Sequence, residues 1–334
     1  HDNKKGTVRI YTYNGTAWSQ QGSDLDGAAA NDYQGGVSLS SDGTTLAVGA
    51  SGHDGSKGTV KIYNYNGTAW SQQGSDLDGA AANDKQGRSV SLSSDGTTLA
   101  VGAYYHDSGK GTVRIYTYNG TAWSQQGSDL DGAAANDYQG ISVSLSSDGT
   151  TLAVGASVHD DTKGTVRIYT YNGTAWSQQG SDLDGAEGNC SCDSQGSSVS
   201  LSSDGTTLAA GAVNHDNTGN DDGKGTVRVY NLIYFIPVAT AQSVTVTEQV
   251  ASTITLAGTR PDGSTPTVYK IISLPSNGTL SDNGALISVG DLPKTTNSAN
   301  VVYTSNSDTA TSDSFTFKVN DGTVDSAAAT VSIT

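Results

Sequence analysis

The sequence predicts an all-β protein: a small propeller-like array of four-stranded repeats, followed by a β-sandwich. Tryptophan recurs at intervals of 52, 53 and 53 residues, and periods of this size are typical of propellers and solenoids. Apolar and polar residues alternate with period two within each repeat, which indicates half-buried strands, and no stretch has helical periodicity. Composition changes near residue 236, because all five prolines lie after it and every histidine lies before it. The tryptophans are Trp18, Trp70, Trp123 and Trp176.

Each repeat of about 53 residues is expected to form four antiparallel strands. In the second copy, alternation over 59–65 predicts a strand, and Asn66-Gly67 predicts a two-residue type I′ turn because both residues accept positive φ. The return strand carries Trp70. A small polar loop is expected over 76–88, and two further strands are expected over 90–101 around a Ser-Asp-Gly turn.

The strands do not divide evenly among the repeats. Three strand types occur four times each, but the Gly-Thr-Val strand occurs five times, so the chain has seventeen strands where four blades of four need sixteen. The last repeat lacks its Trp strand. The N-terminal strand that carries Trp18 can take its place and close the repeats into a ring. One Gly-Thr-Val strand is then surplus, and it can sit at an edge, displace its copy or pair with another molecule. A closed ring and an open stack of blades both fit this pattern.

Residues 1–236 are expected to form the repeat domain and residues 237–334 a β-sandwich. The second domain shows short strand-like runs about 10 residues apart, separated by Pro, Gly and Asn turns, a spacing typical of sandwiches. The expected strands are Ser243–Thr247, Thr253–Leu256, Thr267–Ile272, Ala299–Thr304, Ser314–Val319 and Ala327–Ile333.

Composition favours a soluble protein of the cell exterior. The chain has 334 residues, only 34% of them hydrophobic, with 42 glycines and a formal charge of −16. Such an acidic surface argues against nucleic acid and anionic membranes as partners. No run approaches the 18 apolar residues of a membrane span, so no membrane insertion is expected. The chain lacks methionine and opens inside a repeat, so we expect further residues upstream.

The sequence resembles two known families. The pattern from Tyr33-Gln34-Gly35 through the strand Val48-Gly49-Ala50 to Gly58-Thr59-Val60 resembles the FG-GAP repeats of integrin-α-type β-propellers. That family usually carries an Asp-rich calcium loop at the first hairpin, where this chain has one carboxylate, Asp42. The run Leu274–Leu280, with Asp313–Phe317, resembles bacterial cadherin-like and Ig-like modules of surface adhesins. These resemblances imply an extracellular, adhesive or structural role.

Calcium is the one cofactor that the sequence suggests, and none is required. The densest oxygen ligands form one insertion, which is either a cation site or a solvated acidic loop. Its candidate ligands are Asp216, Asn220, Asp221 and Asp222. The recurrent Asp24-Leu25-Asp26-Gly27 motif is half of a calcium loop, with Asp32 as a possible further ligand; solvated turns are the favoured interpretation.

Two kinds of covalent modification are expected. Cys190 and Cys192 form either a tight local disulfide, which we favour, or part of a metal site, for which only Asp193 is near. Five Asn-Gly-Thr sequences match the N-glycosylation pattern, although a hairpin turn alone explains Asn-Gly. These acceptor candidates are Asn14, Asn66, Asn119, Asn172 and Asn277.

No catalytic residue is predicted. His-Asp recurs once per repeat, as in His53-Asp54, and a structural loop is favoured over metal binding or catalysis because an active site is normally a single asymmetric constellation. Repeated tyrosines are expected to pack between blades in preference to forming a glycan platform. We therefore expect a non-enzymatic structural or adhesive protein that binds itself, other surface proteins or glycans. It would self-associate into a filament through the extra N-terminal strand or through interdomain contacts. A monomeric calcium- or glycan-binding adhesin is the alternative, and a hydrolase is the third class.

Overall fold

The computed structural model describes residues 2–186, 193–215, 224–232, 237–260, 265–266, 268–306, 312–320 and 325–334. The chain divides into two compact units, His1–Asn231 and Leu232–Thr334. Both are built from β-strands, and the fold class expected from the sequence is confirmed: repeated four-stranded sheets that resemble propeller blades precede an Ig-like sandwich. In the described part of the chain, no helix is long and apolar enough to cross a membrane.

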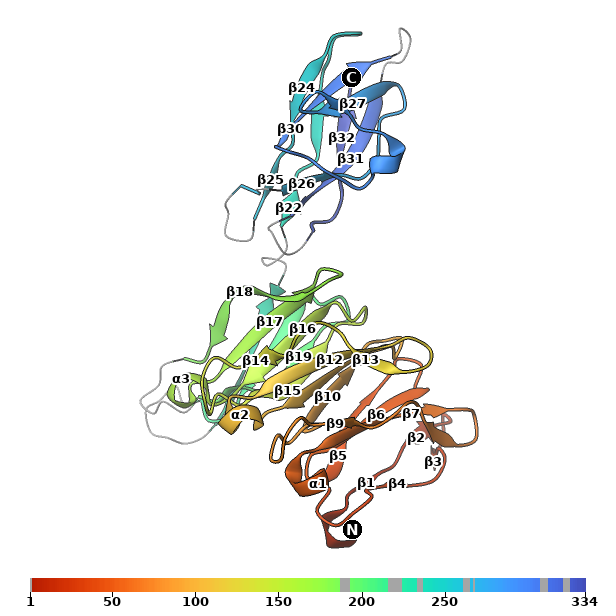
Figure 1. Ribbon diagram of the computed structural model, residues 1–334, viewed down its shortest axis with the longest axis vertical. Coiled ribbons are helices and arrows are strands. Elements are labelled where there is room, and N and C mark those ends of the chain that lie inside the picture. The colour runs from red at the N-terminus through yellow and green to blue at the C-terminus, as the bar shows by residue number, and fades with distance from the viewer. Residues whose placement is uncertain are drawn as a thin grey trace. The chain divides into compact units, whose positions relative to one another are not determined.

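The N-terminal unit is a row of antiparallel sheets, each formed by one repeat (Figure 1). The half-sheet consists of β1 (Thr7–Val8), β2 (Tyr11–Tyr13), β3 (Trp18–Gln20) and β4 (Leu25–Asp26). Sheet I contains β5 (Gln34–Leu39), β6 (Thr45–Ala50), β7 (Thr59–Tyr65), β8 (Trp70–Gln72) and β9 (Leu77–Asp78). Sheet II contains β10 (Ser89–Leu92), β11 (Thr98–Ala103), β12 (Thr112–Tyr118), β13 (Trp123–Gln125) and β14 (Leu130–Asp131). Sheet III contains β15 (Gln139–Leu145), β16 (Thr151–Ala156), β17 (Thr165–Tyr171) and β18 (Trp176–Asp184), and sheet IV contains β19 (Gln195–Leu201), β20 (Thr207–Ala212) and β21 (Thr226–Asn231).

The second strand of sheets I, II and III is buried on both faces. Leu46 and Val48 of β6 point toward the half-sheet and pack on its Val8 and Ile10, while Ala47 points toward sheet II. Because both faces are covered, this strand reads as a continuous run of apolar and small residues, and every residue of β6 is buried. The core of this unit is therefore a series of thin layers between successive sheets.

Two local expectations were wrong. Only Gly67 of the Asn66-Gly67 pair has positive φ, so the type I′ turn is not adopted; Gly67 and Thr68 are the loop residues, and the Asn66 side chain accepts the Thr68 and Ala69 N–H groups. The expected loop over 76–88 contains the short strand β9, which pairs with β7. The His-Asp loops are short turns, α1 (His53–Ser56), α2 (His106–Gly109) and α3 (His159–Thr162), whose two central residues have positive φ and are not helical. A further short turn, η1, covers Asp2–Lys4.

The C-terminal unit is a sandwich of two sheets around one core. One sheet has the strand order β23-β32-β31-β26-β29 and the other β24-β30-β27-β28, with β22 and β25 paired separately. Buried Tyr269, Tyr303, Phe315 and Phe317 are the largest side chains between them. The elements are β22 (Val238–Ala239), β23 (Gln242–Val244), β24 (Ser252–Thr255), β25 (Gly258–Thr259), β26 (Val268–Ile271), β27 (Gly278–Asp282), β28 (Ala285–Leu286), η3 (Val289–Asp291), β29 (Lys294–Thr295), β30 (Asn300–Ser305), β31 (Asp313–Asn320) and β32 (Ala329–Ile333).

Candidate functional site

The candidate functional site is the pair of surfaces at which the row of sheets ends, and the interior of the row shows what such surfaces normally contact. Val60 and Ile62 of β7 are completely buried against Leu99 of the next sheet. Val113 and Ile115 of β12 repeat this packing against Leu152 and Val154. Each Gly-Thr-Val strand therefore presents two branched apolar side chains to the sheet that follows.

Hydrogen bonds between sheets recur at the same positions. The Leu92 N–H donates to Ser38 Oγ at 2.9 Å, and the pairs Leu145–Ser91 and Leu201–Ser144 repeat this bond at the same distance. A backbone series runs beside it, in which the Ser94 N–H donates to the Ser147 carbonyl at 2.9 Å and its counterparts do the same. The sheets are thus joined by directional bonds as well as by apolar packing, so each sheet has a defined place on its neighbour.

Among the described residues, no sheet covers the face of sheet IV that points away from sheet III. Val227 and Val229 of β21 occupy the positions of Val60 and Ile62, yet they are 67% and 70% exposed. Val213 is also exposed. We call these three residues the tail face. Sheet IV also lacks a fourth strand, so one edge of β21 has no partner strand among the described residues.

The opposite end of the row is half covered. The half-sheet shields Leu46 and Val48 but leaves Val37 and Leu39 of β5 exposed, although Leu92 and Leu145 at the position of Leu39 are buried. We call Val37, Leu39, Leu46 and Val48 the head face. Trp18 on β3 is 69% exposed and contacts Tyr13 with a ring separation of 5.3 Å. Trp18 therefore does not complete sheet IV in this structure, and the row is open.

The remaining tryptophans lie between sheets. Trp70 donates its Nε1–H to the Gln21 carbonyl at 3.0 Å and lies so close to Gly22 that a Cβ there would be 2.9 Å from its Cδ1. Trp123 and Trp176 lie over Gly74 and Gly127 in the same way. The Tyr–Trp pairs of sheets I to III, with rings 5.1–5.4 Å apart, pack in this layer, as the favoured interpretation of the tyrosines expected, whereas the Tyr13–Trp18 pair is exposed. Gly180 of sheet III is the next glycine of the series and is exposed.

An arginine–aspartate pair closes the outer edge of three Gly-Thr-Val strands. The Arg9–Asp24, Arg114–Asp129 and Arg167–Asp182 ion pairs span 2.7, 2.8 and 2.7 Å. Each aspartate lies six residues after the tryptophan of its repeat, in what we call the Trp segment. The hydrogen bond from Arg9 holds the pKa of Asp24 below its usual range. Arg228 of β21 has no such segment beside it and pairs with Asp193 at 2.9 Å.

The four described histidines of the His-Asp motifs each face a buried aspartate from another part of their repeat. The histidine Nδ1 faces an aspartate 21 or 22 residues earlier: 3.1 Å for His53–Asp32 and 3.0 Å for His159–Asp137. These aspartates are almost fully buried and also accept backbone N–H groups, as Asp32 does from Ala29. The same arrangement joins His106 to Asp84 and His215 to Asp193. Because the carboxylates are used within the fold, the arrangement ties two loops of each repeat together.

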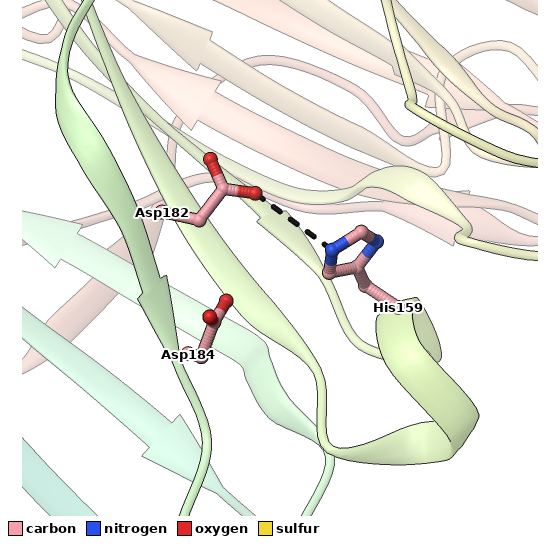
Figure 2. Close-up of side chains that lie close together, drawn as sticks. All are labelled: His159, Asp182 and Asp184. Carbon is pink, nitrogen blue, oxygen red and sulfur yellow. Dashed lines mark ion pairs between the residues drawn. The ribbon is translucent and has the colours of Figure 1, made fainter.

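His159, Asp182 and Asp184 form one group whose ligand atoms lie within 4.8 Å of one another (Figure 2). The His159 Nε2 is 3.8 Å from Asp182 Oδ2. The Arg167 guanidinium contacts the same oxygen at 2.7 Å, so a cation is already present. Burial opposes ionisation of Asp182, but hydrogen bonds from Arg167 and Gln178 lower its pKa overall. The group is therefore a neutralised network and does not resemble a vacant metal site.

The remaining site predictions fall in several places. Cys190 and Cys192, like Asp216, Asn220, Asp221 and Asp222, lie outside the described residues. Four glycosylation candidates are exposed at hairpin turns: Asn14, Asn66, Asn119 and Asn172. Asn277 is half-buried and donates its Nδ2–H to the Ser312 carbonyl. The carboxylates of Asp24, Asp26 and Asp32 do not converge, because Asp26 accepts the Thr7 hydroxyl and each of the others has the partner given above.

Comparisons with known proteins bear on the fold alone. Residues 235–334 match the family described as Bacterial Ig domain. No curated protein matches the sequence. TolB from Acinetobacter baumannii is 11% identical with a TM-score of 0.37, over 99% of this chain and 68% of its own. A putative TolB from Agrobacterium tumefaciens is 12% identical with a TM-score of 0.37, over 63% of this chain and 62% of its own.

A third solved structure is the β-propeller domain of the Trilobed protease from Pyrococcus furiosus. It is 11% identical with a TM-score of 0.40, over 67% of this chain and 59% of its own. This chain therefore spans 59–68% of the length of the three structures. The N-terminal region resembles β-propellers, and the C-terminal region matches the bacterial Ig domain.

Proposed function

We propose that this protein is a non-enzymatic, extracellular structural or adhesive component that associates with itself through the two open ends of its N-terminal row. The observation that carries the proposal is the exposure of Val227 and Val229, whose counterparts in the interior sheets are 0–2% exposed. Burying a branched apolar side chain contributes about 2 kcal/mol relative to leaving it in water. An exposed apolar sheet face of this kind is typical of an interaction surface.

The resemblance to FG-GAP repeats and to cadherin-like and Ig-like modules supports a location at the cell surface. Both families belong to adhesive proteins of the cell exterior. The formal charge of −16 supports a protein partner over nucleic acid.

The repeated polar networks support a structural role over catalysis. In each described repeat, the His–Asp pair is held by backbone N–H groups of the same fold. A catalytic base and nucleophile normally face a substrate cleft, in one asymmetric arrangement. The repetition and burial of these aspartates instead indicate that they stabilise loops.

Sedimentation velocity of the full chain tests the proposal. The unmodified chain is expected to sediment as concentration-dependent oligomers, and the variant Val227→Asp/Val229→Asp as a monomer with unchanged circular dichroism. The two valines are exposed in the monomer, so the variant disturbs no core contact. The proposal would be contradicted if the unmodified chain stayed monomeric at all accessible concentrations.

A glycan-binding adhesin is the second candidate function. Its support is the exposed Tyr13–Trp18 pair, because aromatic faces at a surface can stack on sugar rings. It predicts that a glycan array detects ligands of the unmodified chain that Trp18→Ala loses. Calcium binding at Asp216–Asp222 remains a sequence prediction.

A further inference from the structure

We propose that two copies join by strand exchange: β21 of one copy takes the place of β1–β2 on a second copy and pairs there with β3–β4. This inference rests on the proposed self-association and names its interface. The tail face is then covered by the head face of the second copy, and sheet IV gains its missing fourth strand. In the interior of the row, the two apolar residues of each Gly-Thr-Val strand are covered by the second strand of the next sheet. The head face offers the same kind of surface, so a second copy of this chain can cover the tail face.

The two competing strands are nearly identical. Gly6–Tyr11 reads GTVRIY and Gly225–Tyr230 reads GTVRVY, so they differ only at Ile10 and Val229. Val8 and Ile10 of the first pack on Leu46 and Val48 of the head face. Val227 and Val229 have the same spacing and nearly the same shape, so β21 can make the same contacts.

The resident strand pairs with other strands on one side only. The interior strand β7 pairs with β6 on one side and with β8 and β9 on the other. Within the described residues, β1 pairs only with β4 and β2 only with β3, on a single side. The interior strand is continuous over seven residues, whereas β1 and β2 are separate short strands. An incoming strand that is already paired with β20 therefore replaces one-sided pairing with two-sided pairing.

The register of the exchanged pair follows from the existing one. Thr7 lies opposite Asp26 and Val8 opposite Leu25, and Thr165 and Val166 occupy the same positions against β18. Thr226 is thus expected opposite Asp26, and Val227 opposite Leu25. This register brings Arg228 next to Asp24 of the second copy. Sheet IV thereby gains the arginine–aspartate pair that Arg114–Asp129 and Arg167–Asp182 form in sheets II and III. The same register also places Trp18 over the exposed Gly180.

The hydrogen-bonding groups of the two ends match as well. In the interior, a leucine N–H donates to a serine Oγ of the preceding sheet, as Leu145 does to Ser91. At the ends, Leu39 N–H occupies the donor position and Ser200 Oγ the acceptor position. Stacking sheet IV of one copy on sheet I of another pairs these two groups, and it likewise pairs the Ser203 N–H with the Ser41 carbonyl.

The join is between molecules because the two ends of one row are held apart. The half-sheet packs on sheet I and sheet IV packs on sheet III, and buried apolar layers lie between sheets I, II and III. Figure 1 shows β1–β4 at one end of this unit, away from β19 of sheet IV. A ring closed within one chain requires these layers to rearrange, whereas a second copy meets the tail face as it stands.

Disulfide trapping tests the exchange. All variants carry Cys190→Ser and Cys192→Ser, so that only introduced thiols react. Position 26 lies opposite 226 in the exchanged register, at a non-hydrogen-bonded position where the Cα separation of about 4.5–5.5 Å suits a disulfide. We expect a mixture of Asp26→Cys chains with Thr226→Cys chains to form covalent heterodimers, and the double variant Asp26→Cys/Thr226→Cys to form a ladder of covalent oligomers. The matched control Thr7→Cys/Asp26→Cys reports the unexchanged state by closing within one chain.

The outcomes separate the exchange from self-association itself. Oligomers that sediment normally but give no 26–226 disulfide overturn the exchange and leave the proposed function standing. A double variant that closes as a covalent monomer overturns the join between molecules in favour of a closed ring. Deleting residues 2–13 is an independent test, because it removes β1 and β2 from the head face. The exchange predicts that this variant assembles faster, and loss of assembly would overturn the exchange.

Discussion

At the scale of single residues, one glycine in each sheet sets how closely the sheets approach. A Cβ on Gly102 would lie 2.0 Å from the Gly140 carbonyl oxygen of the next sheet, a contact that no side chain can make. Gly211 is the equivalent residue of sheet IV, and there the nearest atoms belong to Ser198 of the same sheet. The two glycines therefore differ only in whether a sheet follows them.

Gly102→Ala is expected to destabilise the monomer by about 3 kcal/mol, because backbone must move to relieve the clash. Gly211→Ala is expected to change the monomer by less than about 1 kcal/mol but to weaken self-association, since a second copy would meet the added methyl group. Urea denaturation of the two variants measures the first effect and sedimentation the second. Equal losses of stability would show that the glycine has another role.

The turn aspartates predict a dependence of stability on acid. Hydrogen bonds from Ser40 and Thr44 lower the pKa of Asp42 from its ordinary 3.8. Burial opposes the shift at Asp95, but hydrogen bonds from Ser93 and Thr97 still lower its pKa. A carboxyl whose folded pKa lies below its unfolded pKa stabilises the fold above the unfolded value, and this contribution is lost as pH falls through the folded pKa.

The melting temperature of the chain is therefore expected to fall as pH drops below about 4. Replacing Asp42, Asp95, Asp148 and Asp204 together by Asn keeps an acceptor oxygen at each turn but removes the titrating charge. This variant should show a shallower decline between pH 5 and pH 2 by calorimetry. An identical slope for both proteins would assign the acid sensitivity to other groups.

At the scale of elements, the Trp strand has two different environments. Trp176 is buried in the layer over Gly127, whereas Trp18 is the one tryptophan left at an open end. Trp176→Ala should cost about 3 kcal/mol of monomer stability. Trp18→Ala should leave the melting temperature nearly unchanged and reduce assembly. If Trp18→Ala proves as destabilising as Trp176→Ala, the N-terminal strand is packed more tightly than its exposure indicates.

The strand pattern of the repeats was predictable because it depends on local signals. Alternation over β7 and the Ser-Asp-Gly turn after β10 follow from period and turn chemistry, and both appear where expected. In the C-terminal unit the sequence indicated β24, β30 and β31 but missed β27. The strand β27 was missed because its run Gly278–Asp282 lacks consecutive branched residues and pairs mainly through its partner β30.

Tertiary partners were less predictable. Asp54 follows His53 in the sequence, yet the histidine faces Asp32, which lies 21 residues earlier. The repeat spacing of Asp32 and His53 was the signal that could have paired them. The openness of the row could not be read from the sequence either, because the odd strand count fits both a ring and a stack.

At the scale of the whole molecule, the account predicts independence from divalent cations in the described part of the chain. Asp182 of the His159–Asp182–Asp184 group already contacts Arg167. Adding a chelator should leave the melting temperature and the oligomer distribution unchanged. A fall in either would point to a cation at the predicted ligands Asp216–Asp222, because a ligand that binds the folded state stabilises it by mass action.

The central claim is that the tail face of each molecule is covered by another copy. Electron microscopy of the full chain in negative stain, with and without a chelator, tests it most directly. The account predicts regular filaments that survive chelation and are absent for Val227→Asp/Val229→Asp. Single particles of one chain at all concentrations, or filaments that the valine variant still forms, would contradict it.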